Sequence, residues 1–281
     1  MLKTLMKHEI RATARTFLWL YLAFVGISTV NALIAPGAIG SLSVTPAGAT
    51  NIMMPNIVQG TAMVLYVVAI AAIAIVTFVV IILRFFRNLL GDEGYLMFTL
   101  PVTREQHVMS KLLVAVMWCV CSAVLVALSV FVMIGAFGAS AEISNALTNL
   151  ISTGLPLGRY ILTLVIMLIL ASFAGVLMLY LAMAIGPNLL KNRVGGSTLA
   201  FLLIVIAYQI ISGIVAVSMM AAQSGYIASV AAVPHSVPAD LQASLSIIDT
   251  TMLAGIILNA IVAVACWFLT IFMLKRKLNL A

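Results

Sequence analysis

Charged residues are scarce in this sequence. Only 7% of its 281 residues are Asp, Glu, Lys or Arg, whereas about a quarter is usual for a soluble domain, and 64% are hydrophobic. A water-soluble fold could not bury so much apolar surface. The chain also lacks the short segments of alternating hydrophobicity that are typical of a transmembrane barrel. The composition therefore predicts an all-α integral membrane protein.

Motifs of catalysis and nucleotide binding are also missing. There is no Gly-Lys pair to form a Walker A loop, no His-Glu-x-x-His and no Gly-x-Ser-x-Gly. Cys119, Cys121 and Cys266 lie inside apolar runs and provide neither a disulfide framework nor metal-ligand spacing. Nucleic-acid binding is not indicated either, because the chain has no cluster of basic residues interleaved with aromatic ones. We therefore expect a chain that is not an enzyme and binds no cofactor or metal of its own.

Six apolar runs contain no Asp, Glu, Lys, Arg or His. Each holds at least 19 residues, and a helix needs roughly 20 to cross the hydrocarbon core of a bilayer. Helices are the expected form because their backbone groups are satisfied within the segment. The connections are too short for a separate folded domain, so we predict one transmembrane domain over 1–281. Its predicted spans are 17–35, 62–83, 112–138, 160–185, 199–222 and 251–274.

The basic residues predict an orientation. Thirteen of the fourteen lie before the first span, between the second and third, between the fourth and fifth, or after the sixth. Only Arg159 falls on the opposite side. Because Lys and Arg are enriched in cytoplasmic segments, both termini are expected in the cytoplasm.

The first 16 residues have the pattern of an amphipathic helix. Its basic stripe, Lys3, Lys7, Arg11 and Arg15, recurs every four residues, opposite an apolar face. Such a helix is expected to lie in the inner headgroup layer with its bases toward anionic lipid. Glu9 falls on the apolar side. Two interpretations remain open: a carboxylate that snorkels or pairs locally with lysine, or a contact to a protein partner.

The stretch GDEGYLMFTLPVTREQ, residues 91–106, joins the second and third predicted spans. Asp92 is suited to cap a short helix, with Glu93 in its first turn, and Pro101 would end that helix. A capping-box pattern at 103–106 then starts a second helix that runs into the third span. The short helix presents an apolar surface that either rests on the membrane interface or docks into a soluble partner. That surface consists of Tyr95, Leu96, Met97, Phe98 and Leu100.

This loop carries a resemblance. The run FRNLLGDEGYLMFTLPV, residues 86–102, resembles the first cytoplasmic loop of membrane subunits of type-2 ABC exporters, and the segments KHEIRATAR and KRKLNL are similar to bacterial members. The resemblance implies a permease in a bacterial cell membrane whose coupling helix fits a separate ATPase subunit. Two permeases, identical or related, would then work with two ATPases, which bind ATP and magnesium. The expected coupling residues are Asp92, Glu93, Gly94, Tyr95, Leu96, Phe98, Leu100 and Pro101.

The resemblance also implies that the second and fifth spans face a dimer axis. Candidate residues of a translocation path are therefore Tyr66, Phe78, Tyr208, Gln209 and Ser212, although ordinary helix packing through their polar tips is an equal interpretation. An uncharged path suits a lipophilic or amphipathic substrate.

Outside the membrane, Ser236 and Pro238 predict the start of a short helix near 238–247, which matches a re-entrant helix of the family. Two other functions stay open. One is a membrane sensor or immunity protein that binds a peptide. The other is a secondary transporter, which would usually place ionisable residues within the bilayer.

Overall fold

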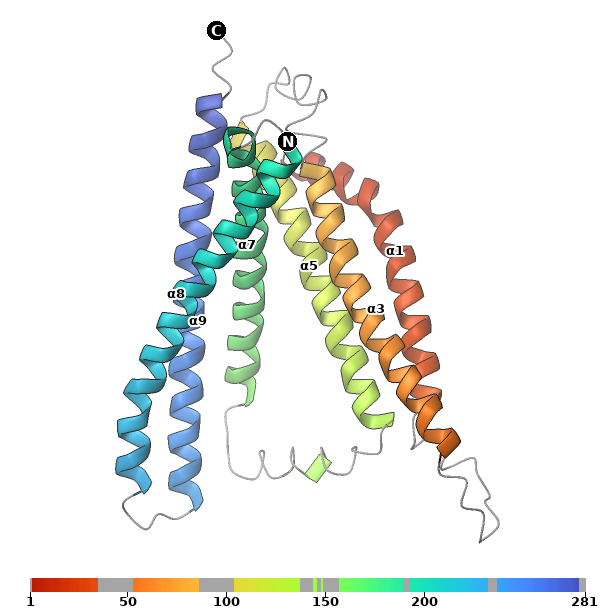
Figure 1. Cartoon of the computed structure of the whole chain (residues 1–281), viewed down its shortest axis with the longest axis vertical. Coiled ribbons are helices and arrows are strands. Elements are labelled where there is room, and N and C mark those ends of the chain that lie inside the picture. The colour runs from red at the N-terminus through yellow and green to blue at the C-terminus, as the bar shows by residue number, and fades with distance from the viewer. Residues whose placement is uncertain are drawn as a thin grey trace. The chain divides into compact units, whose positions relative to one another are not determined.

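The computed structural model describes residues 2–34, 53–85, 104–136, 144–145, 148, 157–189, 193–231 and 237–277. Within these ranges the fold is all-helical, with six long helices and no strand (Figure 1). The helices are α1 (Leu2–Ile34), α3 (Met53–Phe85), α5 (Arg104–Ile134), α7 (Leu157–Leu189), α8 (Arg193–Ala231) and α9 (Val237–Lys277).

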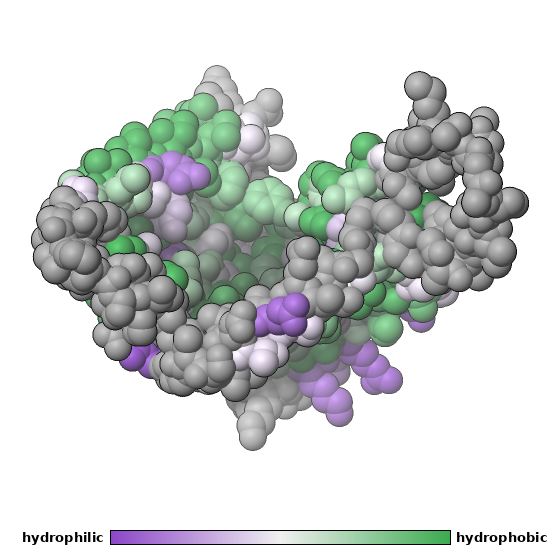
Figure 2. Space-filling model, turned by 90° about the horizontal axis from the view of Figure 1, so that it is seen from below, coloured by the Kyte–Doolittle hydropathy of each residue, from purple (hydrophilic) through white to green (hydrophobic). Residues whose placement is uncertain are grey.

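Each long helix includes all or most of one predicted span, and residues 35 and 137–138 of the first and third spans lie outside the described residues. The segments that are long and apolar enough to cross a membrane are Leu5–Ile34, Gly60–Arg84, Val108–Ile134, Gly158–Gly186, Gly195–Ala222 and Ile247–Met273. On the face shown in Figure 2, hydrophobic residues cover most of the described surface and hydrophilic ones gather in a few small patches. Six helices are thus long and apolar enough to cross a membrane, which indicates a multi-pass membrane protein.

The chain divides into two compact units, Met1–Leu157 and Gly158–Ala281. In the first unit, α1 packs against both α5 and α3, which lie side by side (Figure 1). Its apolar core consists of Phe24, Tyr66, Ala69, Ile73 and Met133. The single domain expected from the sequence stays a prediction.

Two short helices expected from the sequence are not separate elements. Residues 2–34 form one continuous helix, so no break near residue 16 divides an interfacial helix from the span. The helix expected near 238–247 begins at Val237, as its start signals predict, but it continues to Lys277. The predicted end of this helix, near residue 247, was therefore wrong. Neither Gly nor Pro occurs between Ala239 and Ala254, so nothing in the sequence stops the helix.

In the second unit, α8 packs along α9. The hydroxyl of Tyr208 donates to Asn259 Oδ1 at 3.3 Å, and Asn259 Nδ2 donates to the carbonyl of Gly255 at 2.8 Å. The end of α7 also meets the start of α8 at two glycines. A Cβ built on Gly186 would lie within 2.5 Å of three atoms of Ser197, and one on Gly196 would lie 2.8 Å from the carbonyl carbon of Gly186. The two backbones are thus in direct contact.

Candidate functional site

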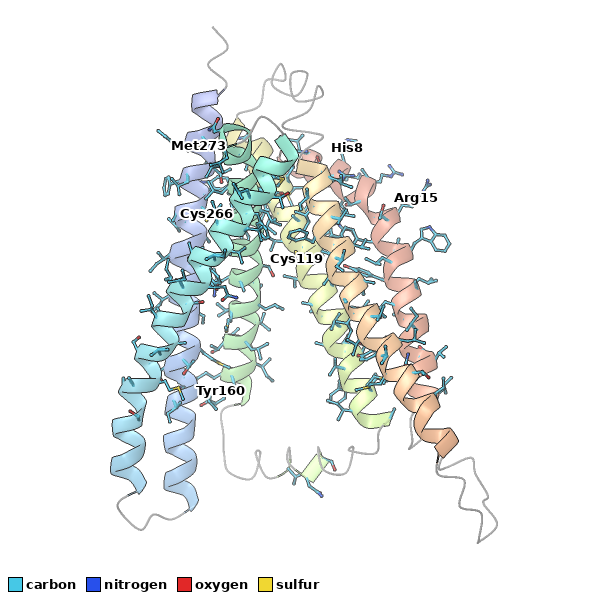
Figure 3. The ribbon with its side chains drawn as sticks, in the orientation of Figure 1. His8, Arg15, Cys119, Tyr160, Cys266 and Met273 are labelled. Carbon is cyan, nitrogen blue, oxygen red and sulfur yellow. The ribbon has the colours of Figure 1, made fainter. Side chains whose placement is uncertain are left out.

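The N-terminal part of α1 has one exposed face and one face that is buried against the bundle. Lys7, Arg11 and Arg15 of the basic stripe are exposed, and the side chain of Arg15 projects away from the neighbouring helices (Figure 3). Glu9 and Thr13 lie on the other face, where Thr13 is only 4% exposed. Three of the four bases of the stripe are thus on the face opposite Glu9 within a continuous helix; the side chain of Lys3 lies outside those described, and the interfacial helix stays a prediction.

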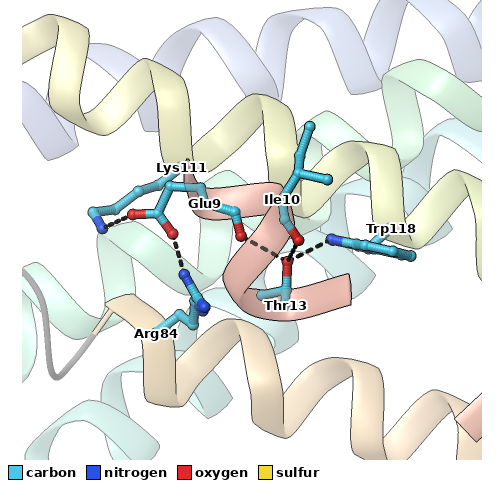
Figure 4. A network of polar contacts seen from close by, with 6 residues as sticks. All are labelled: Glu9, Ile10, Thr13, Arg84, Lys111 and Trp118. Carbon is cyan, nitrogen blue, oxygen red and sulfur yellow. Dashed lines mark hydrogen bonds and ion pairs between the residues drawn. The ribbon is translucent and has the colours of Figure 1, made fainter. Parts of the chain in front are cut away.

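Glu9 is held by two cations from two other helices. Its Oε2 pairs with Nη1 of Arg84 on α3, and its Oε1 accepts from Nζ of Lys111 on α5 at 2.7 Å (Figure 4). The exposed fractions of the side chains are 12% for Glu9, 5% for Lys111 and 29% for Arg84. One carboxylate thus bridges α3 and α5, through partners 75 and 102 residues further along the chain.

The balance of charge makes this cluster sensitive to the loss of Glu9. One negative charge lies between two positive charges, in a place where little water screens them. Buried ions are tolerated when they are paired, and removal of one partner leaves an uncompensated charge behind. Without the carboxylate, Arg84 and Lys111 would repel each other across the space that it now fills.

One turn further along α1, Thr13 fixes the helix to α5. Its hydroxyl oxygen accepts from Nε1 of Trp118 at 2.9 Å (Figure 4). The same hydroxyl lies 2.9 Å from the carbonyl oxygen of Glu9 and 3.1 Å from that of Ile10, to which it can donate. Phe17 stacks on the Trp118 ring, with ring centroids 4.4 Å apart and planes 6° from parallel. These contacts hold the turn that carries Glu9 in a fixed position on α5.

Hydroxyl groups continue the polar contacts along the same three helices. The hydroxyls of Tyr21 and Ser122 lie 2.8 Å apart, and Ser122 also lies 3.2 Å from the hydroxyl of Thr77. Further along, Tyr66 and Ser129 form a hydroxyl pair at 2.8 Å. Apolar helices in lipid gain no hydrophobic drive from packing against each other, so such bonds contribute to their association. They tie α1 and α3 to α5 over much of the bundle.

The charged cluster lies at the two helix ends that bracket residues 86–103. Arg84 is the penultimate residue of α3, and Lys111 lies in the second turn of α5. Helix α5 begins at Arg104, where the capping-box pattern places a helix start. The predicted coupling residues lie outside the described residues: Asp92, Glu93, Gly94, Tyr95, Leu96, Phe98, Leu100 and Pro101. Their docking role stays a prediction.

Two candidate path residues lie in the first unit. Tyr66 is 5% exposed and packs in the core beside Phe24, with its hydroxyl on Ser129. Phe78 is 37% exposed on α3. The polar tip of Tyr66 is thus used in helix packing, which is the other interpretation given to it.

The remaining three lie on α8 in the second unit. Tyr208 is bonded to Asn259, whereas Gln209 is exposed. The Ser212 hydroxyl lies 3.1 Å from the carbonyl of Gln209, to which it can donate. A translocation path along these residues stays a prediction.

Sequence reasoning missed the partners of Glu9. The sequence uses Arg84 and Lys111 only to predict the orientation of the chain and does not predict that they pair with Glu9. The sequence does carry a cue for Lys111, because the apolar residues Val108 and Ala115 lie three residues before it and four after it, on the same face of a helix. A base on an apolar face needs an acidic partner to balance its charge. Glu9 likewise lies on an apolar face, that of α1, and is the partner that Lys111 has.

Comparison with known proteins adds no relative to this picture. No protein-family model, curated protein or solved structure matches the chain. Among the described residues, no group of three or more His, Cys, Asp and Glu side chains is placed to hold a metal ion.

Proposed function

We propose that this chain is the permease subunit of an ATP-binding-cassette exporter. Six helices that suit a bilayer, the absence of catalytic motifs from the sequence and the resemblance of residues 86–102 to a coupling loop support this function. The chain would reside in a bacterial cell membrane with both termini in the cytoplasm. ATP and magnesium would bind to a separate ATPase subunit, and a second permease copy or a related chain would complete the path.

The observation that carries the proposal is the charged cluster at the base of the loop. A coupling helix transmits force only if the helices on both sides of it are firmly connected to the rest of the bundle. Glu9 supplies that connection, because it pairs with Arg84 just before the loop and with Lys111 just after it. Docking of an ATPase against residues 93–100 would then act on α1, α3 and α5 together.

The placement of charge also separates this function from a secondary transporter. The ion-paired side chains lie within five residues of the end of a candidate span: Glu9, Arg84, Lys111, Arg159 and Asp249. Ion-coupled carriers usually keep ionisable groups well inside the bilayer. A peptide-binding sensor or immunity protein has no such requirement, and it differs from a permease by needing no ATPase.

The test is copurification of an ATPase with the intact chain, followed by reconstitution of both. If Phe98 fills a cleft on the ATPase, Phe98→Ala costs about 3 kcal/mol. Binding should then fall about a hundredfold, since each 1.4 kcal/mol is a factor of ten. Phe131→Ala is the matched control, because Phe131 is 61% exposed on α5 and should not affect ATPase binding.

Two different results would contradict the proposal. Normal ATPase binding and normal substrate-stimulated ATP hydrolysis by Phe98→Ala would reject the docking role of the loop. If no ATPase copurifies with the wild-type chain under any condition that retains the membrane, the exporter function itself is wrong and a sensor or immunity protein is favoured.

A further inference from the structure

Both carboxylate oxygens of Glu9 are used, and each is used by a different helix. We propose that Glu9 is a positioning residue: by pairing with Arg84 and Lys111, it sets the separation of the helix ends that bracket residues 86–103. The loop is thereby tied to α1. The positioning role depends on the described contacts alone, and only its consequence for transport rests on the proposed function.

The two bonds of Glu9 differ in how easily they can open. Lys111 is 5% exposed, so its separation from Glu9 would leave a cation with little access to water. Arg84 is 29% exposed and lies at the end of α3, where its guanidinium can reach solvent or headgroups once it is released. The Arg84 bond is therefore the one that opens, and the Lys111 bond is the one that persists.

Helix α1 is also fixed to α5 independently of Glu9. Trp118 donates to Thr13 and stacks on Phe17, one to two turns beyond the carboxylate. Displacement of α3 relative to α5 thus breaks the Glu9–Arg84 pair before it separates α1 from α5. At this end of the bundle, α1 and α5 therefore form the fixed pair, and the Glu9–Arg84 bond holds the end of α3 to them, in addition to the core and hydroxyl contacts that α3 makes further along.

The distribution of charge on α1 supports a dedicated role for this acid. Glu9 is the only acidic residue of the helix, and it faces the bundle, whereas Lys7, Arg11 and Arg15 face outward. A carboxylate that served only solubility or lipid contact would lie on the outer face. This one instead lies where it contacts both helix ends.

The experiment measures distances between spin labels in the full chain, reconstituted into nanodiscs. One label pair joins exposed positions on α1 and α3, Ala12→Cys and Leu83→Cys. A second pair joins Ala12→Cys to Gln106→Cys on α5. The native cysteines are replaced by Ala in all samples. Arg84→Gln is the main variant because Lys111 still neutralises Glu9 in it, and Arg84→Lys is the conservative control.

The expected result is a longer and broader α1–α3 distance in Arg84→Gln, a nearly native distance in Arg84→Lys and an unchanged α1–α5 distance in both. An unchanged α1–α3 distance in Arg84→Gln would overturn the proposal. If the α1–α3 distance lengthened equally in Arg84→Gln and Arg84→Lys, the proposal would also be overturned, because the charge of residue 84 would then not set that distance. Glu9→Gln should lengthen the α1–α3 distance at least as much as Arg84→Gln.

The transport consequence is measured separately. In the complex with its ATPase, Arg84→Gln should lower substrate-stimulated ATP hydrolysis about fivefold, the lower end of typical coupling between sites, with ATPase binding retained. If distances respond as expected but no ATPase binds to the wild type, the positioning role stands and the exporter function fails. If an ATPase binds and the distances change but hydrolysis is unaffected, Glu9 does position the helix ends, and the proposed effect of this positioning on ATP hydrolysis is wrong.

Discussion

The end of α7 and the start of α8 lie so close together that adding one methyl group at Gly186 should destabilise the protein. Gly186→Ala would place a Cβ within 2.5 Å of the hydroxyl oxygen, amide nitrogen and Cα of Ser197. Two of these atoms belong to the backbone, so rotation of the Ser197 side chain cannot relieve the overlap. The helices would have to separate by roughly 1 Å to restore ordinary contact distances of about 3.5 Å or more.

The expected cost can be compared with a matched control. Gly175→Ala lies on the same helix and its Cβ would meet nothing within 4 Å. That change should be neutral or stabilising, because Ala is favoured over Gly in a helix by up to about 1 kcal/mol. Gly186→Ala gains the same preference but also overpacks the contact, which typically costs 1–3 kcal/mol and more where backbones clash. The two variants should therefore differ by about 2 kcal/mol, with opposite or nearly opposite signs.

A thiol-reactive fluorogenic dye provides the assay. Cys266 on α9 is 6% exposed and lies in the same unit as Gly186 (Figure 3), so its labelling on heating reports loss of packing there. Cys119 and Cys121 are replaced by Ala to remove their signal. A 2 kcal/mol difference corresponds to about 4–8 °C in the midpoint for a chain of this size. Equal midpoints for Gly186→Ala and Gly175→Ala would show that the two backbones are not in contact.

Three further predictions concern orientation, the hydroxyl contacts and the basic stripe. Single cysteines at Thr45 and Lys277 should label oppositely with an impermeant thiol reagent in intact cells, and labelling of both from outside would reject cytoplasmic termini. Tyr66→Phe should lower stability by only about 0.6 kcal/mol, typical of a hydroxyl bond between membrane helices, and a loss above 2 kcal/mol would show that more than this one bond is lost. Replacing the basic stripe by Gln should weaken the contact of this helix with anionic lipid by about 1 kcal/mol per residue, and unchanged insertion, orientation and assembly would show that the stripe is only a solvated face.

Most of the helical layout could be predicted from the sequence because membranes impose a simple rule. A run of at least 19 residues without charges is long enough to cross a bilayer as a helix, and each predicted span coincides over most of its length with one of the long helices. The ends were harder to place. Apolar runs mark the hydrocarbon core, whereas a helix can extend well beyond that core, as the 41-residue helix α9 does from its start at Val237.

The contacts between helices could not be predicted in the same way. Glu9 was recognised as out of place on an apolar face, but its partners lie 75 and 102 residues away, and spacing along one helix carries no information about them. The glycine contact was missed for a similar reason. Ala182 and Gly186, and likewise Gly196 and Ala200, have the spacing of small residues one helical turn apart, but this spacing does not predict that Gly186 of α7 and Gly196 of α8 contact each other.

The same basic residues serve two purposes in this chain, and this limits how their substitutions are to be interpreted. Arg84 and Lys111 belong to the excess of bases that predicts the orientation, and both are also bound to Glu9. Arg159, the base on the opposite side, forms an ion pair with Asp249, so its charge is locally balanced. Loss of Arg84 therefore removes one topology signal among thirteen and half of the Glu9 bridge. Arg84→Lys keeps both the topology signal and the charge, whereas Arg84→Gln loses both. A changed α1–α3 distance can therefore be assigned to the loss of the Glu9 bridge only if Thr45→Cys is labelled as in the wild type in each variant, which shows that the orientation is unchanged.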